Sequence, residues 1–210
     1  MILLAPALLS VIVGYLRKGR LAGLIGIRLR GVWCVLLAFG LEASTGLLKG
    51  WFPDLFPRFM WAECLLQYGL LFAFILLNGR HWTVAVMGIG ILLNFLVMIL
   101  NGGRMPVSPA VLADPWNAGL IERIESGDIP EYIIMHGGEP LWFLGDVIRI
   151  PFRWAGYASI GDAVLAVGVS ALIQKGMILG RPKHAGGGNA RSEKPRAVAA
   201  DGGGGGANTR

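Results

Sequence analysis

The sequence has few charged residues and few of the side chains that usually hold metals or form cross-links. Of its 210 residues only 15% are charged, 3 are histidine and 2 are cysteine, whereas 54% are hydrophobic. Soluble domains carry about 25% charged residues, so this composition is typical of a membrane protein. No nucleophile paired with a base and no set of metal ligands stands out in the sequence. It therefore predicts no cofactor and no metal site, and it leaves open whether the protein is an enzyme.

The two cysteines are not expected to form a disulfide. Cys34 and Cys64 lie in neighbouring apolar runs. If these runs form an antiparallel hairpin, the two residues lie on the order of 20 Å apart at a rise of about 1.5 Å per residue. A disulfide needs Cα atoms within about 7 Å of each other. Both are expected to be small, buried core residues.

The 19 lysines and arginines lie in clusters between apolar runs, which indicates that they set membrane topology. The basic C-terminal tail has no aromatic residue on which a base could stack, so no nucleic-acid partner is expected. The first cluster is interleaved with leucine and isoleucine. We interpret this cluster as a loop whose charges fix the orientation of the protein in the membrane. The alternative is that it contacts anionic lipid. Its members are Arg17, Lys18, Arg20, Arg28 and Arg30.

Five apolar runs predict an all-α, polytopic membrane protein with about five transmembrane helices. The predicted spans cover residues 1–16, 31–48, 62–78, 82–100 and 155–174. The distribution of basic residues predicts an N-terminus outside the cytoplasm and a C-terminus inside it. Residues 1–178 then form the membrane domain, which includes an extracytoplasmic segment over residues 101–153. The Gly-rich, basic residues 179–210 are expected to be a disordered cytoplasmic tail.

A start signal and a stop signal predict a short helix after residue 101. Asp114-Pro115 is typical of a helix start and Gly127 of a helix stop. The apolar residues between them share one face, which favours a short amphipathic helix resting on the bilayer. These residues are Trp116, Leu120, Ile121 and Ile124.

The last span opens with a predicted capping box, because Ser159 is followed three residues later by Asp162. Gly161, Gly168 and Ala171 fall on one helical face of this span. Small residues on one face allow another helix to approach closely.

Polar side chains inside the predicted spans lie at one depth. Glu42, Gln67 and Asn94 are each roughly 8 to 9 Å below the outer end of their span. Such residues are costly in a bilayer and are candidates for function. The candidate polar cluster or ligand site consists of Glu42, Glu63, Gln67, Asn94, Asn101, Arg104, Asp146 and Asp162.

The cluster has two interpretations, a polar clasp that holds the bundle together or a pocket that opens to the outer leaflet. The clasp is favoured. Arg104 is expected to pair with Asp146, Asp162 or Glu42. Gly102-Gly103 is explained by helix capping better than by a phosphate cradle. His136 and Glu139 are too few ligands for a zinc site.

Three motifs together make the chain similar to a known family. They are residues 101–108 (NGGRMPVS), residues 143–146 (FLGD) with Ile150-Pro151 behind them, and residues 159–162 (SIGD). With these motifs the chain resembles a bacterial family of small integral membrane proteins, domain of unknown function 5317, over roughly residues 1–178. The resemblance implies a multi-pass protein of the bacterial cytoplasmic (plasma) membrane and brings no activity with it.

The favoured interpretation is that the protein is a non-enzymatic scaffold or binding protein. Membrane lipid is its expected partner. The alternative is a small membrane enzyme or carrier that takes an amphiphilic anion, such as a lipid phosphate, from the outer leaflet. In that alternative Arg104 holds the anionic group. The sequence leaves open whether the protein forms a homo-oligomer.

Overall fold

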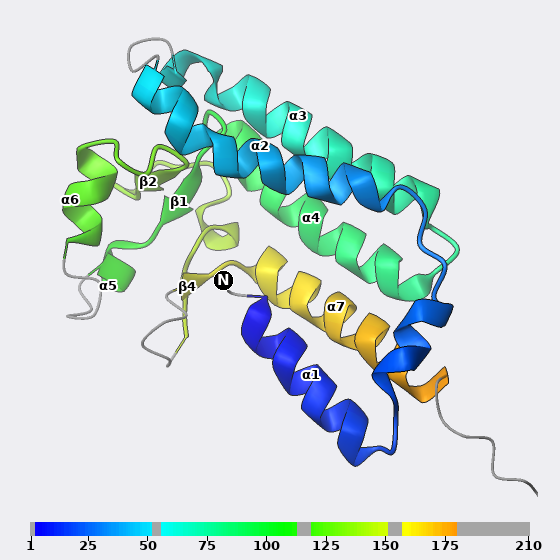
Figure 1. Cartoon of the computed structure of the whole chain (residues 1–210). Coiled ribbons are helices and arrows are strands. Elements are labelled where there is room, and N and C mark those ends of the chain that lie inside the picture. Colours follow the sequence, from blue (N-terminus) through cyan, green and yellow to red (C-terminus); the bar gives the residue numbers. More distant parts are fainter. Residues whose placement is uncertain (1–2, 52–55, 113–118, 151–156, 180–210) are drawn as a thin grey trace, which may run out of the picture.

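The computed structural model describes residues 3–51, 56–112, 119–150 and 157–179. Five long helices dominate it (Figure 1). They are α1 (Leu4–Leu16), α2 (Val32–Trp51), α3 (Phe56–Leu77), α4 (Trp82–Leu100) and α7 (Ile160–Leu179). Each corresponds to one predicted apolar run. The last run was predicted at residues 155–174, whereas α7 begins at Ile160. The reason is that Tyr157 and Ala158 pair as a strand with Ile148–Arg149 and Ser159 caps the helix.

Three helices of the described part are long and apolar enough to cross a membrane: Arg58–Leu77, Trp82–Leu100 and Ile160–Leu179. Leu4–Leu16 and Val32–Thr45 are shorter apolar helices. The expectation of a mostly helical chain with several helices able to cross a membrane is therefore met. The number five and the orientation of the termini stay predictions.

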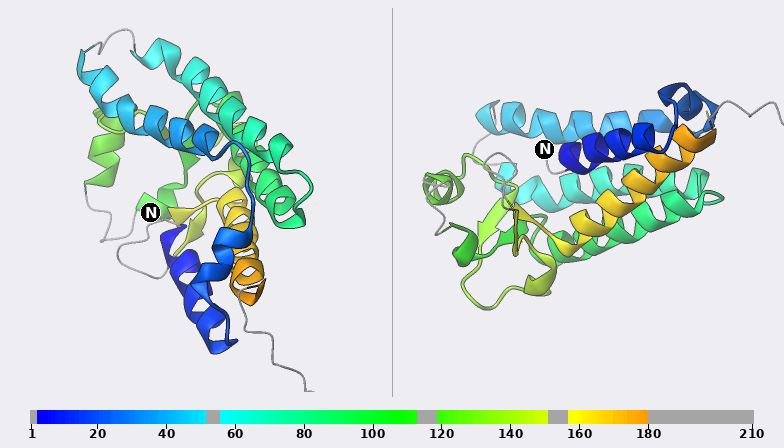
Figure 2. Two further views of the ribbon diagram at one scale, coloured as in Figure 1. Left: turned by 45° about the vertical axis from the view of Figure 1, so that its right-hand side comes forward. Right: turned by 90° about the horizontal axis from the view of Figure 1, so that it is seen from below.

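The helices pack in a chain of neighbours, in which α1 lies on α7, α7 on α4, α4 on α3 and α3 on α2 (Figures 1 and 2). Helices α4 and α7 approach each other closely at two glycines. A Cβ atom on Gly90 would lie 2.5 Å from the carbonyl oxygen of Gly161 and 2.7 Å from the backbone nitrogen of Leu165. Gly168 likewise lies against Met87 of α4. Close helix packing is thus confirmed for Gly161 and Gly168.

The basic segment after α1 is attached to the ends of α3 and α7. It contains the short helix η1 (Leu21–Gly26). Arg20 donates its backbone N–H to the Met177 carbonyl at 2.9 Å, and the Arg17 guanidinium donates to the Gln174 side chain at 3.1 Å. The Asn78 side chain accepts the Arg30 N–H at 2.8 Å and donates to the Arg30 carbonyl at 2.7 Å. These bonds fix the position of the segment, while its contact with anionic lipid stays a prediction.

The two cysteines are buried and not bonded, as predicted. Cys34 packs with Phe74 and Val84, whereas Cys64 packs in a separate cluster around Tyr68.

Between α4 and α7 the chain forms short elements that cover one end of the bundle (Figure 1). They are β1 (Met105–Val107), α5 (Pro109–Leu112), α6 (Leu120–Glu125), β2 (Tyr132–Ile134), η3 (Trp142–Leu144), β3 (Ile148–Arg149) and β4 (Tyr157–Ala158). β1 and β2 are parallel, with Pro106 opposite Ile133, and β3 and β4 are antiparallel. These strands were not predicted, because two or three residues are too few to show the alternation of a strand.

Helix α6 is the predicted amphipathic helix, but its apolar face covers the strands. Ile124 is buried with Val107 and Tyr157, and Leu120 packs against them. The expectation that this face rests on the bilayer is therefore wrong for these two residues. The predicted start at Asp114, and Trp116, lie outside the described residues. Gly127, with a φ of +72°, ends the helical turn as predicted.

Candidate functional site

The turn after α4 directs the chain across the end of the bundle. Asn101 ends the helix, and Gly103 donates its N–H to the Met98 carbonyl at 2.8 Å, which is the long bond of a Schellman motif. Gly102 and Gly103 have φ values of +70° and +81°. A Cβ atom on Gly103 would lie 2.4 Å from the carbonyl oxygen of Met60. Because the Gly103 N–H is used within the turn, capping explains these glycines and a phosphate cradle does not.

The predicted capping box at the start of α7 is present and is joined to α4. Ser159 Oγ accepts the Asp162 N–H at 2.8 Å, and Asp162 accepts the Ser159 N–H at 3.1 Å. The Asn94 amide donates to the Asp162 carboxylate at 2.8 Å, and Ser159 Oγ donates to the Asn94 oxygen at 2.7 Å. Ser159 and Asn94 are buried. One hydroxyl and one amide thus link the two helices next to their glycine contact.

A second set of hydrogen bonds joins α2 to α3. The Gln67 amide donates to the Glu42 carboxylate at 3.2 Å, and the Thr45 hydroxyl donates to the Glu63 carboxylate at 3.1 Å. Tyr68 directs its hydroxyl to the Met98 sulfur at 3.3 Å.

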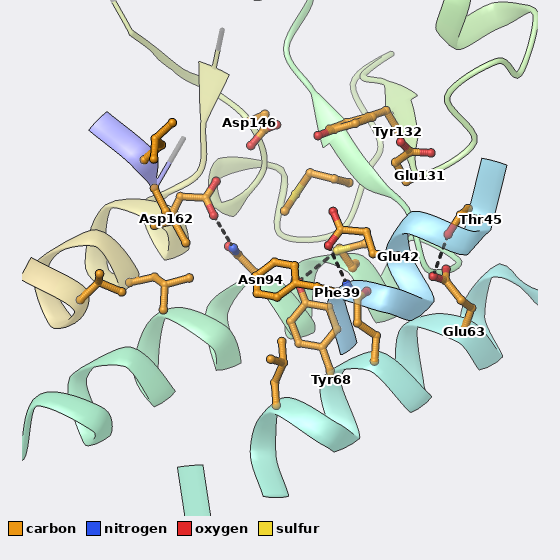
Figure 3. Close-up of a pocket in the computed structure, with 18 of the residues that line it drawn as sticks. Phe39, Glu42, Thr45, Glu63, Tyr68, Asn94, Glu131, Tyr132, Asp146 and Asp162 are labelled. Atoms are coloured by element: carbon orange, nitrogen blue, oxygen red, sulfur yellow. Dashed lines mark hydrogen bonds between the residues drawn. The ribbon is translucent and has the colours of Figure 1, made fainter. Parts of the chain in front are cut away.

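The two sets line one cavity of about 620 Å³ under the β1–β2 segment (Figure 3). All the predicted site residues except Asn101 and Arg104 line it. Asn101 instead donates to the carbonyls of Val97 and Pro140. The polar residues of the lining are Glu42, Thr45, Glu63, Gln67, Tyr68, Asn94, Glu131, Tyr132, Asp146 and Asp162.

Asp146 is the one strongly buried carboxylate of this lining. Its side chain is 6% exposed, and its Oδ1 atom has no hydrogen-bond partner among the described residues. Its backbone is fixed by β1, because Asp146 N–H donates to the Pro106 carbonyl at 2.9 Å and Ser108 N–H donates to the Asp146 carbonyl at 3.2 Å. Burial, and then the charge of Asp162, raise the pKa of Asp146 to about 8. A buried carboxylate oxygen without a hydrogen-bond partner is costly, and a proton or a cation at this oxygen relieves the cost.

Arg104 does not supply that cation in the part of the chain described here. Arg104 was expected to pair with Asp146, Asp162 or Glu42, but it lies outside the lining that these three acids share, and Asp146 Oδ1 has no hydrogen-bond partner among the described residues. The physical reason is the glycine turn. Gly103 folds against α3, and Met105, which is buried, is the residue of this segment that lines the cavity.

The residues of the cavity lining that lie outside the predicted polar cluster were not predicted from the sequence. Glu131 and Tyr132 reach the cavity only because β2 pairs with β1. Phe39 and Thr45 are each three residues from Glu42, so the helical spacing could have placed them on its face, whereas Tyr68 follows Gln67 directly and spacing gives no such signal.

The His136–Glu139 turn is also explained locally. The Glu139 carboxylate accepts the backbone N–H groups of His136, Gly137 and Gly138 at 2.8, 3.0 and 3.0 Å. These hydrogen bonds, first that of His136, lower the pKa of Glu139 to about 2. Within the described ranges, no three histidine, cysteine, aspartate or glutamate side chains are placed to hold a metal ion.

The cavity is suited to positive charge. Among the described residues its lining contains five carboxylic acids and no lysine, arginine or histidine; the acids are Glu42, Glu63, Glu131, Asp146 and Asp162. A cleft lined by one sign of charge concentrates ions of the other sign. Phe39, Tyr68 and Tyr132 add aromatic rings, which attract organic cations. Burial raises the pKa of Tyr132, so its phenol stays neutral.

Comparison with known proteins gives one match. The model of a family described as Family of unknown function (DUF5317) matches residues 26–174. This match confirms the resemblance carried by the three motifs. No curated protein and no solved structure matches the chain.

Proposed function

The chain belongs to this family of unknown function, and we propose that it is a multi-pass membrane protein that binds a positively charged organic ligand in the cavity under β1 and β2. The unpartnered Asp146 oxygen carries this proposal. It is buried, it lines the cavity, and a cation placed there gives it the partner that it lacks.

The polar clasp favoured by the sequence accounts for part of the cluster. The hydrogen bonds among Asn94, Ser159 and Asp162 join α4 to α7 and serve stability. A clasp gives no reason to bury the Oδ1 atom of Asp146 without a hydrogen-bond partner, because such an atom costs roughly 1–3 kcal/mol. Binding therefore explains more of the cavity than structure alone.

The alternative of an anionic ligand is not favoured. It relied on Arg104, which lies outside the lining, and a lipid phosphate would meet five carboxylic acids of the described lining. Like charges at close range disfavour binding by several kcal/mol. A compact metal ion is also a poor fit, since the described acids are not grouped around one point. An organic cation can reach several of them.

The proposal includes five spans, with the N-terminus and the cavity outside the cytoplasm, in a bacterial plasma membrane. The basic segment at the other end supports this orientation. Its residues Arg17, Lys18 and Arg20 are exposed at the end of the bundle opposite the cavity.

Cysteine labelling tests the orientation. In a background with Cys34→Ala and Cys64→Ala, a membrane-impermeant maleimide added to intact cells is expected to label Glu125→Cys and not Lys18→Cys. Both positions are exposed, so access depends on the side of the membrane. Labelling of Lys18→Cys together with protection of Glu125→Cys would reverse the proposed orientation.

Binding is tested with butylammonium as the probe and the purified full chain. At pH 8 butylammonium is expected to raise the unfolding temperature, because a ligand that binds only the folded state stabilises it. Butanol and butyrate are expected to leave it unchanged. Asp146→Asn should weaken the effect of butylammonium, whereas Glu125→Gln, an exposed acid on α6, should retain it. A rise in unfolding temperature of the same size in the wild type, Asp146→Asn and Glu125→Gln would contradict the proposed function.

A further inference from the structure

The cavity extends from the buried carboxylate to the side of the helix bundle. Besides its acids, its lining includes Leu4 of α1 and Phe39 of α2. Both are also on the surface, with 52% and 55% of the side chain exposed. Residues that line a cavity and are exposed at the same time mark its mouth. The mouth therefore lies between α1 and α2.

The packing of the helices leaves this position on the outside of the bundle. α1 packs along α7, and α2 packs along α3, so the two helices belong to different pairs (Figures 1 and 2). The cavity is lined from both pairs.

Glu42, which also lines the cavity and is exposed on α2, is at the mouth as well, whereas the helix surface around it is apolar. One turn from Leu4 on α1 lies the exposed Leu8, and one turn from Phe39 on α2 lies the exposed Leu36. Side chains of this kind on a membrane helix face hydrocarbon. A ligand that uses this mouth therefore comes from the bilayer and needs an apolar part.

The inner end of the cavity has the opposite character. Asp146, Glu131 and Asp162 line this end, and Figure 3 shows Glu131 beside Tyr132, Asp162 beside Asn94, and Asp146 between these two pairs. The apolar residues Leu165 and Val169 of α7 continue the wall away from these acids. A molecule with a cationic head and an alkyl chain matches this order of polar and apolar walls.

We propose that the ligand is an amphiphilic amine, which reaches the cavity sideways from the lipid between α1 and α2 and places its cationic head against Asp146. This inference rests on the proposed binding of a cation and adds the alkyl chain and the route. The head is held by charge, and the chain stays in contact with Leu4, Phe39 and the lipid.

The test is photolabelling of the full chain in phosphatidylcholine nanodiscs. The probe is dodecylammonium with a diazirine on its chain, and the control probe is dodecanol with the same diazirine. The ammonium probe is expected to label the segments that contain Leu4 and Phe39 about tenfold more than the alcohol does, the ratio given by about 1.4 kcal/mol of interaction. Asp146→Asn should remove most of this preference, and Glu125→Gln should preserve it.

Two results would overturn the inference. One is equal labelling by both probes. The other is ammonium labelling that is spread along the lipid-facing side of α1, over Leu9 and Leu16, and does not depend on Asp146. If butylammonium still stabilises the protein in either case, cation binding stands and only the amphiphile is wrong. If butylammonium also has no effect, the proposed function fails as well.

Discussion

Gly90→Ala is expected to lower the free energy of unfolding by about 3 kcal/mol or more, at the upper end of the range for overpacked cores. The new Cβ atom would lie 2.5 Å from the Gly161 carbonyl oxygen. A backbone atom cannot rotate away, so α4 and α7 must separate. Separation also weakens the bonds of Asn94 to Ser159 and Asp162, which lie next to this contact.

The matched control for this helix substitution is Gly69→Ala in α3. Nothing lies within 4 Å of a Cβ atom added at Gly69. Alanine there is expected to leave stability unchanged or to raise it by up to about 1 kcal/mol through helix propensity. Unfolding of both variants in detergent, followed by circular dichroism against increasing dodecyl sulfate, gives the comparison. Equal stability of the two variants would contradict the close α4–α7 contact.

Asp146→Asn is expected to stabilise the ligand-free protein at pH 8 and above, by about 1–3 kcal/mol, and to change little at pH 4. The ordinary pKa of 3.8 is raised to about 8 by burial and by Asp162. At a pH between 3.8 and about 8, Asp146 is protonated in the folded protein and ionised in the unfolded chain. The contribution of Asp146 to stability is therefore largest below about pH 4 and falls as the pH rises toward 8. Asparagine carries no charge and removes this part of the pH dependence.

The measurement is the free energy of unfolding of both proteins from pH 4 to pH 9 without added amine. Glu125→Gln serves as the control, because Glu125 is exposed and its replacement should leave the slope of the wild type intact. A difference in stability between the two proteins that does not change from pH 4 to pH 9, or an Asp146→Asn variant that is less stable than the wild type at pH 8, would show that Asp146 has a permanent partner.

The long helices and the polar layer could be predicted because their signals are local. Apolar runs of about 20 residues predict helices, and the spacing of Ser159 and Asp162 predicts the reciprocal bonds that the structure has. Counting residues from the outer end of each span placed Glu42, Gln67 and Asn94 at one depth. The structure brings all three to one cavity.

The cover of the cavity could not be predicted, because it depends on contacts between distant residues. Met105 pairs with Tyr132 in strands of three residues, and Pro106 in the centre of β1 argues against a strand from sequence alone. Arg104 was expected at the cavity because charge alone was considered. Its place is set by the backbone of Gly103, whose close approach to Met60 the sequence does not reveal.

Whether the buried carboxylate receives a positive charge is tested most directly by titrating butylammonium into the full-length protein at pH 8 in a calorimeter. The prediction is that butylammonium binds and releases protons from Asp146, that Asp146→Asn binds about tenfold more weakly, and that Glu125→Gln binds as the wild type does. Binding with the same affinity in all three proteins, or no binding to the wild type, would contradict a cation site at Asp146.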